Sequence, residues 1–350
     1  MTPEPPVVSA NTTFVRPSTF YISGFSNIPH TKYYYVFLCT VYAVTILGNS
    51  FIMCTIYLTR ALHTAKYVAV FNLALSDLGG SSALIPKLID TFLFGNQVIS
   101  YETCLTNMFF VLIFMTEQSL TLLVMAYDRV VAICFPLRYN VIVTKASMTL
   151  LIVITWIISI IIIALLVALI TRLSFCRSTV INSYFCDHGP VYLLACNDYF
   201  VNRVMAVACF VLLACLPLML ITVSYICIGI ALLNISRGFE RKKAMKTCTS
   251  HLILVALFYL PFFGTNVASL TSFITVNDRI INSTLTQTIP PMLNPIIYTL
   301  KTEEVMNAVK VLYKRVKAVV ICGVASGQVI HPQSGVGSQI KSSQARKPQH

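Results

Sequence analysis

The sequence predicts an all-α membrane protein, built as a seven-transmembrane helix bundle with a short amphipathic eighth helix. Three observations predict this fold class. First, 57% of the 350 residues are hydrophobic and only 11% are charged, whereas soluble proteins average about half apolar and a quarter charged residues. Second, apolar stretches long enough to cross a bilayer recur along the chain. Third, Lys and Arg gather in alternate segments between these stretches.

Seven spans follow from length and charge, because a bilayer core requires about 20 mostly apolar helical residues. Four carry no Asp, Glu, Lys or Arg and cover residues 33–58, 148–170, 204–233 and 247–274. Three more contain a few polar residues or prolines and cover residues 67–86, 103–127 and 280–300. The expected parts of the chain are an N-terminal extracellular tail (1–32), the seven-helix domain (33–300), an amphipathic juxtamembrane helix (301–322) and a disordered cytoplasmic tail (323–350).

The orientation follows from the basic residues, because cytoplasmic loops carry the excess of Lys and Arg. With the N-terminus outside, 18 of the 25 Lys and Arg residues fall inside. The sequence therefore predicts a multi-pass membrane protein with its N-terminus on the outer side. Its net charge of +13 reflects this asymmetry and contact with anionic membrane lipids, so nucleic acid is not an expected partner. Residues 1–32 lack the apolar core of a cleavable signal peptide.

Four of the twelve cysteines fall on the outer side: Cys104 at the start of the third span, and Cys176, Cys186 and Cys196 in the loop after the fourth. That side is oxidising, so disulfides persist there. Four cysteines allow three pairings, which spacing alone does not separate. Asn11 begins the sequence Asn-Thr-Thr and is the predicted glycosylation site.

Three polar residues lie near the middle of their spans. Asn49, Asp77 and Glu117 are each about ten residues, or roughly 15 Å, from the inner end of a helix. Ionisable groups at this depth are costly and usually face the bundle interior. Two interpretations stay open: an internal hydrogen-bond network that joins helices, or a site for a bound cation or a proton-coupled switch.

Residues 302–317, TEEVMNAVKVLYKRVK, repeat apolar side chains at helical spacing and carry Lys and Arg on the other flank. Directly after a membrane span, this pattern predicts an interfacial helix rather than a helix of a soluble core. Cys322 is a candidate lipidation site.

Five strings carry a resemblance to a known family. They are MAYDRVVAICFPLRY (125–139), SYICI (224–228), KAMKTCTSHL (243–252), PPMLNPIIYTLK (290–301) and the loop FCDHGPVYLLAC that ends at Cys196. With seven spans and an outside N-terminus, the chain resembles the olfactory receptor family of rhodopsin-type G-protein-coupled receptors over residues 48–301.

This resemblance implies a receptor, not an enzyme, that binds a small-molecule odorant and activates a heterotrimeric G protein of the stimulatory olfactory type, which raises cyclic AMP. It implies that Asp128 restrains Arg129 in the resting state. Activation would free Arg129 to meet the C-terminal helix of the G protein. Tyr225 and Tyr298 belong to the same G-protein-coupling region.

The resemblance also implies two disulfides, Cys104–Cys186 and Cys176–Cys196. It further implies a polar core, with a sodium ion at Asp77 as the candidate bound cation. The residues of this polar core are Asn49, Asp77, Glu117, Gln118 and Asn294.

The chain departs from the family pattern in three places. Family members usually show Pro-Met-Tyr where residues 65–67 read Ala-Lys-Tyr, Tyr where Val130 stands, and Glu where Gln118 stands. The carboxylate of Glu117 is thus one position early. A shift of one residue turns a side chain by about 100° around the helix, so the sodium site at Asp77 does not carry over directly. The departures indicate a divergent member.

The ligand pocket implied by the family lies between the outer halves of the third, fifth, sixth and seventh helices. It comprises Val111, Leu112, Met115, Thr116, Cys209, Leu213, Tyr259, Phe262, Phe263, Asn266 and Gln287. The set is apolar with a few neutral polar groups, as small-ligand pockets commonly are. Because a buried charge without a partner is costly, we expect small neutral or weakly polar ligands. A charged odorant would instead need Arg203 or the loop residues Arg177, Asp187 and His188, although loop charges are usually solvated.

Two other classes of protein remain as alternatives. One is a rhodopsin-type receptor for a non-odorant small ligand. The other is a seven-helix transporter or channel, for which broken helices or paired charges along a path are typical. Asp77 and Glu117 are the only carboxylates in the middle of the spans, which disfavours transport. An enzyme is not expected, because the sequence shows no metal cluster, phosphate loop or nucleophile constellation outside the spans.

Overall fold

The structure, a computed structural model, describes residues 14–24, 31–176, 178–234, 238–270, 275–301 and 304–314. The chain divides into two compact units, residues 1–309 and 310–350, and the fold below is that of the first unit. Asn11, Cys322 and the predicted tail 323–350 lie outside the described residues.

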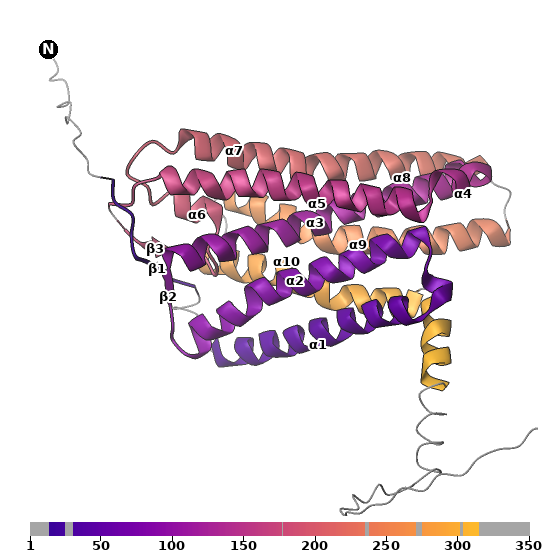
Figure 1. The fold of residues 1–350 in the computed structure, drawn as a ribbon, viewed down its shortest axis with the longest axis horizontal. Coiled ribbons are helices and arrows are strands. Elements are labelled where there is room, and N and C mark those ends of the chain that lie inside the picture. Colours follow the sequence, from indigo (N-terminus) through magenta and orange to yellow (C-terminus); the bar gives the residue numbers. More distant parts are fainter. Residues whose placement is uncertain are drawn as a thin grey trace, which may run out of the picture. The chain divides into compact units, whose positions relative to one another are not determined.

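Seven long helices run side by side in the first unit (Figure 1). They are α1 (Thr31–Leu58), α2 (Ala65–Leu93), α3 (Tyr101–Cys134), α5 (Lys145–Ala168), the continuous run of α7 (Phe200–Phe210), η4 (Val211–Cys215) and α8 (Leu216–Asn234), α9 (Phe239–Leu270) and α10 (Val276–Lys301). Each predicted span overlaps one of them.

Six of the described helices are long and apolar enough to cross a membrane. The seventh, α10, is less apolar because it contains three prolines and several Asn, Thr and Gln residues. The prediction of a helical membrane protein is confirmed. Residues 304–309 continue as helix after α10, and residues 310–314 of the second unit are also helical.

Shorter helices complete the connections. They are η1 (Arg60–Leu62), η2 (Pro136–Arg138), α4 (Tyr139–Ile142), η3 (Leu169–Arg172) and α6 (His188–Tyr192). Side chains cap the start of α5, directly after one of these connections. Thr144 Oγ1 accepts from the backbone N–H of Ser147 at 3.1 Å, and Ser147 Oγ accepts from the backbone N–H of Thr144 at 3.0 Å. This reciprocal capping satisfies two backbone donors that the helix itself leaves free.

Burial separates a central helix from a peripheral one. In the most apolar 18-residue stretch of α3, 67% of the residues are buried inside the protein. In the corresponding stretch of the span that contains α5, only 22% are buried. The side chains of α5 that face outward are therefore apolar without protein partners, as expected for a helix surrounded by lipid.

Two contacts fix α1 against α10. A Cβ added at Gly48 would lie 2.8 Å from Pro295 Cγ, so only glycine permits this approach. Next to it, Asn49 Nδ2 donates to the carbonyls of Thr45 and Pro291, both at 2.9 Å. Asn49 thus joins helices.

The outer end of the bundle carries a small sheet that the sequence did not predict (Figure 1). Strand β1 (Thr19–Ile22) lies between β2 (Val98–Ser100), antiparallel, and β3 (Val180–Ile181), parallel. Thr19 pairs with Ser100, and Tyr21 pairs with Val180. Part of the predicted N-terminal tail therefore packs over the bundle.

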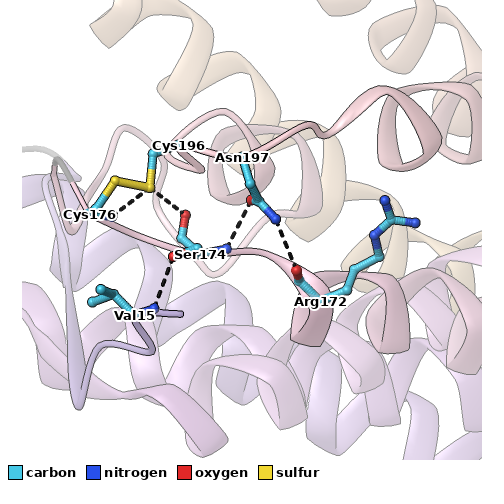
Figure 2. The surroundings of a disulfide bond; sticks show 6 residues. All are labelled: Val15, Arg172, Ser174, Cys176, Cys196 and Asn197. Atoms are coloured by element: carbon cyan, nitrogen blue, oxygen red, sulfur yellow. Dashed lines mark hydrogen bonds between the residues drawn. A yellow bond between two sulfur atoms is a disulfide. The ribbon is translucent and has the colours of Figure 1, made fainter. Parts of the chain in front are cut away.

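Disulfides join Cys104 to Cys186 and Cys176 to Cys196. Figure 2 shows the second bond beside Ser174. The backbone N–H of Val15 donates to Ser174 Oγ at 2.9 Å, and the backbone N–H of Ser174 donates to Asn197 Oδ1 at 3.0 Å. The segment before β1, the loop after η3 and the segment before α7 are therefore held together.

We expect non-reducing peptide mapping of the full-length protein to recover the Cys104–Cys186 and Cys176–Cys196 linkages. Loss of a native disulfide typically costs about 2–5 kcal/mol. Cys104→Ser should therefore reduce surface expression strongly, whereas Cys39→Ser, at an exposed free thiol, serves as the control. Cys104 found free, or linked to Cys176 or Cys196, would contradict the assignment.

Candidate functional site

Two adjoining cavities open between the outer ends of the helices and the loop before α7. The outer one has a volume of about 280 Å³ and is lined mainly by α9, α10 and residues 182–190. The inner one has a volume of about 210 Å³ and lies between α3, α5, α7, η4 and α9. Both are bordered by the same four residues, Leu112, Met115, Asp187 and Phe262.

Eight of the residues predicted for the ligand pocket line at least one cavity. They are Leu112, Met115, Thr116, Cys209, Leu213, Phe262, Asn266 and Gln287. Three others do not. Val111 belongs to a buried cluster with side chains of α1, α2, α10 and the loop residues Tyr184 and Phe185. Tyr259 is 2% exposed and belongs to the largest buried cluster of the bundle. The Phe263 ring packs on Phe210, with centroids 5.6 Å apart.

Sequence reasoning named the loop residues Asp187 and His188 only as contacts for a charged odorant and left the loop out of the pocket. Asp187 and His188 line the inner cavity, and Asp187 also lines the outer one with Arg279 of α10. His188 is only 4% exposed, so this loop residue is not solvated. Arg203 is exposed and lines neither cavity. The signal in the sequence that could have placed the loop at the cavities was Cys186, because its disulfide partner Cys104 lies at the start of α3.

The charges at the outer cavity balance one another. Arg279 donates to the carbonyl of Asn182 at 3.2 Å. Burial raises the pKa of Asp187 more than Arg279 and the backbone N–H groups of His188 and Gly189 lower it. Burial lowers the pKa of His188 to about 4, against the effect of the nearby Leu166 carbonyl. The imidazole of His188 is therefore neutral at physiological pH.

The polar core centres on Asp77, which is fully buried. Its Oδ1 accepts from Gln118 Nε2 at 3.0 Å, and its Oδ2 accepts from Asn294 Nδ2 at 2.7 Å. A cavity of about 10 Å³ borders these three residues, near the lower limit for one water molecule. Because amide donors occupy both carboxylate oxygens, this arrangement suits a hydrogen-bond network better than a sodium ion.

Glu117 is fully buried and points elsewhere. Its Oε1 accepts from Ser159 Oγ at 2.6 Å and its Oε2 accepts from Thr155 Oγ1 at 3.1 Å. Both hydroxyls belong to α5. The one-residue offset thus takes this carboxylate to the α3–α5 contact, while Gln118 occupies the place beside Asp77.

The inner end of α3 carries the ion pair. Arg129 Nη2 lies 2.8 Å from Asp128 Oδ2, and both side chains are largely buried. Asp128 Oδ1 also accepts from the Tyr139 hydroxyl at 2.8 Å. Tyr139 begins α4, so the connecting loop supports the carboxylate that holds Arg129.

The other two tyrosines of the predicted coupling region lie close to α3. The Tyr298 hydroxyl donates to Met125 Sδ at 3.4 Å. The Tyr225 hydroxyl lies 2.8 Å from His251 Nδ1, and His251 Nε2 lies 3.1 Å from the Leu122 carbonyl. Since a carbonyl only accepts, Nε2 carries the proton in the neutral ring, and Tyr225 donates to Nδ1.

Lys66, one of the departures from the family pattern, has a partner in this structure. Lys66 Nζ lies 2.7 Å from Glu304 Oε2, which also accepts from the Tyr67 hydroxyl at 2.6 Å. Burial alone would raise the pKa of Glu304, but these two bonds together with the positive charges of Lys66 and Arg129 hold the pKa below its ordinary value. The start of α2 is thereby tied to the helical segment after α10.

A family model described as olfactory receptor matches residues 38–315. Similar proteins include olfactory receptor 1E16 of Mus musculus, which is 36% identical over 84% of this chain and 93% of its own length. Olfactory receptor 2A12 of Homo sapiens is 37% identical over 80% of this chain and 90% of its own length. Olfactory receptor 1500 of Rattus norvegicus is 37% identical over 80% of this chain and 89% of its own length.

Gln118→Glu should create a response to sodium that the natural chain lacks. Two adjacent carboxylates resist joint ionisation, so the variant should melt several degrees lower in choline chloride, at roughly 2–4 °C per kcal/mol lost. Sodium chloride should restore its melting temperature, because a bound cation stabilises the folded state.

Glu117→Gln is the matched control, because Glu117 contacts α5 instead of Asp77. Its melting temperature should be equally insensitive to the choice of sodium or choline. A sodium-dependent rise in the natural chain as large as that in Gln118→Glu would contradict the hydrogen-bond-network interpretation.

Proposed function

We propose that this chain, which belongs to the olfactory receptor family of G-protein-coupled receptors, binds a small neutral odorant in the two cavities and activates a stimulatory olfactory G protein. The observation that carries this proposal is the arrangement along α3. Leu112, Met115 and Thr116 line the cavities in its outer half, and Asp128 and Arg129 form the buried ion pair near its inner end.

Cavity size supports a small ligand. At about 280 and 210 Å³, each cavity is below the roughly 300–1,000 Å³ of pockets for drug-sized molecules. The predicted pocket residues in the inner cavity are apolar apart from the Thr116 hydroxyl and the Cys209 thiol. An odorant of a few carbons with one polar group fits this description.

Charge balance supports a neutral ligand. Arg279 and Asp187 both line the outer cavity and attract one another. A ligand carboxylate would therefore compete with the Asp187 carboxylate for Arg279. No Lys or Arg borders the inner cavity among the described residues. An ionised ligand there would be buried without a cation, at a large cost in free energy.

A route from the cavities to the ion pair passes through Ser119, which lines the inner cavity. Ser119 Oγ donates to the Leu213 carbonyl at 2.7 Å, in the π-helical η4 segment, and lies 2.7 Å from the Tyr259 hydroxyl. Because Ser119 has one hydroxyl proton, Tyr259 donates to it. A ligand that shifts this contact would move α3, η4 and α9 together. Such π-helical turns are frequent at functional sites.

The inner face supports G-protein coupling. Asp128 holds Arg129 in the described conformation, and release of Arg129 would present a guanidinium to the C-terminal helix of the G protein. Tyr298 contacts Met125 of α3 directly, and Tyr225 reaches α3 through His251, whose ring meets the Leu122 carbonyl. The stimulatory olfactory class of G protein, cyclic AMP as the signal, the plasma-membrane location and the extracellular N-terminus are inferred from family membership and from the charge asymmetry.

Arg129→Ala should reduce odorant-stimulated cyclic AMP to background, because alanine removes the guanidinium that would meet the C-terminal helix of the G protein. Surface expression and glycosylation at Asn11 should be largely retained, since a boundary arginine is not required for insertion. Cyclic AMP normalised to surface protein measures the effect.

Arg138→Ala is the matched control for this substitution, because Arg138 is exposed in η2 and lies in the same connecting loop. It should signal nearly as the natural chain does. Unchanged signalling by Arg129→Ala would refute the proposed role of Arg129.

Asn266→Leu should weaken responses to hydroxyl- or carbonyl-bearing ligands by about 0.5–1.5 kcal/mol, the net contribution of an ordinary hydrogen bond. Asn266 lines the outer cavity, and its Nδ2 donates to the Phe262 carbonyl at 2.8 Å, so Oδ1 remains available to a ligand. A concentration series of matched acids, alcohols and esters measures the shift.

Arg203→Ala should leave these responses unchanged, because Arg203 lines neither cavity. Activation by acids alone, silenced by Arg203→Ala, would overturn the proposal of a neutral ligand.

A further inference from the structure

Gln287 of α10 reaches α3 at the place where the two cavities adjoin. Its Nε2 donates to Met115 Sδ at 3.6 Å, and both side chains are only partly buried. Gln287 lines the outer cavity, and Met115 lines both cavities. The amide end of Gln287 therefore lies beside a side chain that borders both chambers.

The partner of this amide is a weak one. A thioether sulfur has no proton to give, so the amide nitrogen is the group that faces it, and it is a poor acceptor compared with an oxygen. The contact joins α10 to α3 across 172 positions of the chain. A ligand oxygen at the same place would offer the Gln287 nitrogen a better acceptor than Met115 does.

Three other donors of the outer cavity are bonded to backbone carbonyls. Asn266 Nδ2 donates to one at 2.8 Å, Thr286 Oγ1 to another at 2.7 Å, and Arg279 Nη2 to a third at 3.2 Å. A ligand that took over one of these donors would leave a backbone carbonyl without its partner, which is costly. Gln287 differs from them, because replacing its sulfur partner costs little.

We propose that Gln287 donates a hydrogen bond to the carbonyl oxygen of a ketone or aldehyde bound where the two cavities adjoin, in place of Met115 Sδ, and so makes the receptor select carbonyl compounds over hydrocarbons of the same shape. This inference rests on the proposed function, because it concerns the ligand of the same cavities. The displaced Met115 side chain is unbranched and rotates about three bonds, so it adapts to a ligand beside it.

A carbonyl group suits the surroundings of Gln287. It accepts a hydrogen bond without bringing a charge, whereas a carboxylate would need a cation. A hydroxyl group would also have to place its own proton, which a carbonyl does not carry. Leu112 and Phe262, which border both cavities, provide apolar surface for the hydrocarbon part of such a ligand.

Pairs of ketones and methylene isosteres test the proposal in cells that express the full chain with a stimulatory G protein. The probes are cyclohexanone against methylenecyclohexane, cyclooctanone against methylenecyclooctane, and acetophenone against α-methylstyrene. Within each pair a C=O group is replaced by a C=CH₂ group of nearly the same shape, and the acceptor is lost. Because the hydrocarbon is also more hydrophobic, the ratio of half-maximal concentrations within a pair is compared between the natural chain and its variants.

Gln287→Met removes the amide donors and keeps an unbranched side chain of similar length. It should raise the half-maximal concentration of the ketones about fivefold, which corresponds to one ordinary hydrogen bond, and leave that of the methylene compounds nearly unchanged. Gln97→Met, at a glutamine that lines neither cavity, is the matched control and should alter neither value.

Met115→Leu removes the sulfur acceptor and keeps an apolar side chain of similar volume. The Gln287 donor then has no sulfur to leave when a ketone binds, so ketones should act at about threefold lower concentration. In the double variant with Gln287→Met this gain should vanish, because the donor that produces it is absent. Met219→Leu, at an exposed methionine of α8, is the control for this substitution.

The outcomes separate this inference from the function on which it rests. An equal change for ketone and methylene compound in Gln287→Met, a Met115→Leu effect that persists without Gln287, or activation by neutral compounds of other classes alone would overturn the role of Gln287 and leave the odorant receptor proposal standing. Activation by acids alone, or by no neutral compound at millimolar concentration, would overturn the proposed neutral ligand itself.

Discussion

The covalent bond between Cys104 and Cys186 is the constraint on which the two cavities depend. It joins positions 82 residues apart and fixes the middle of a long loop to the start of α3. The residues beside Cys186 therefore form cavity wall: Tyr184 and Phe185 on one side, Asp187 and His188 on the other. Without this tether, the loop entropy would favour many positions, and neither the balanced charges of the outer cavity nor the buried imidazole of the inner one would have a fixed place.

The second determinant is α3, which carries cavity, polar core and ion pair on one rigid element. Met115 borders both cavities, Gln118 donates to Asp77, and Arg129 pairs with Asp128. From Met115 to Arg129 is roughly 21 Å at 1.5 Å per residue. A rotation or translation of α3 reaches both ends at once, and the Ser119 contact with Leu213 and Tyr259 couples that motion to η4 and α9.

The spans and the family motifs were predictable from the sequence because both are local. A run of apolar residues of bilayer length, or a string such as MAYDR, needs no knowledge of distant partners. The small sheet was not predictable, since Thr19 pairs with Ser100 and Tyr21 with Val180 across long separations. The sequence also did not reveal how each helix is rotated about its axis, and therefore which side chains face the cavities. Val111 and Phe263 face protein rather than the cavities, and the π-helical η4 changes which side chains of the fifth span point inward.

The Glu117–Gln118 pair shows how one position redistributes charge inside the bundle. With glutamine beside it, the Asp77 carboxylate accepts from two amide donors, Gln118 and Asn294, which satisfy it without a cation. The displaced carboxylate of Glu117 meets Ser159 and Thr155, two hydroxyls that only α5 supplies. Because a buried carboxylate without such donors is strongly destabilising, Glu117 requires α5 in this register. Glu117 thus has a separate role, which is to fix the position of α5 against α3. The apolar, bilayer-facing surface of α5 could not fix that position alone.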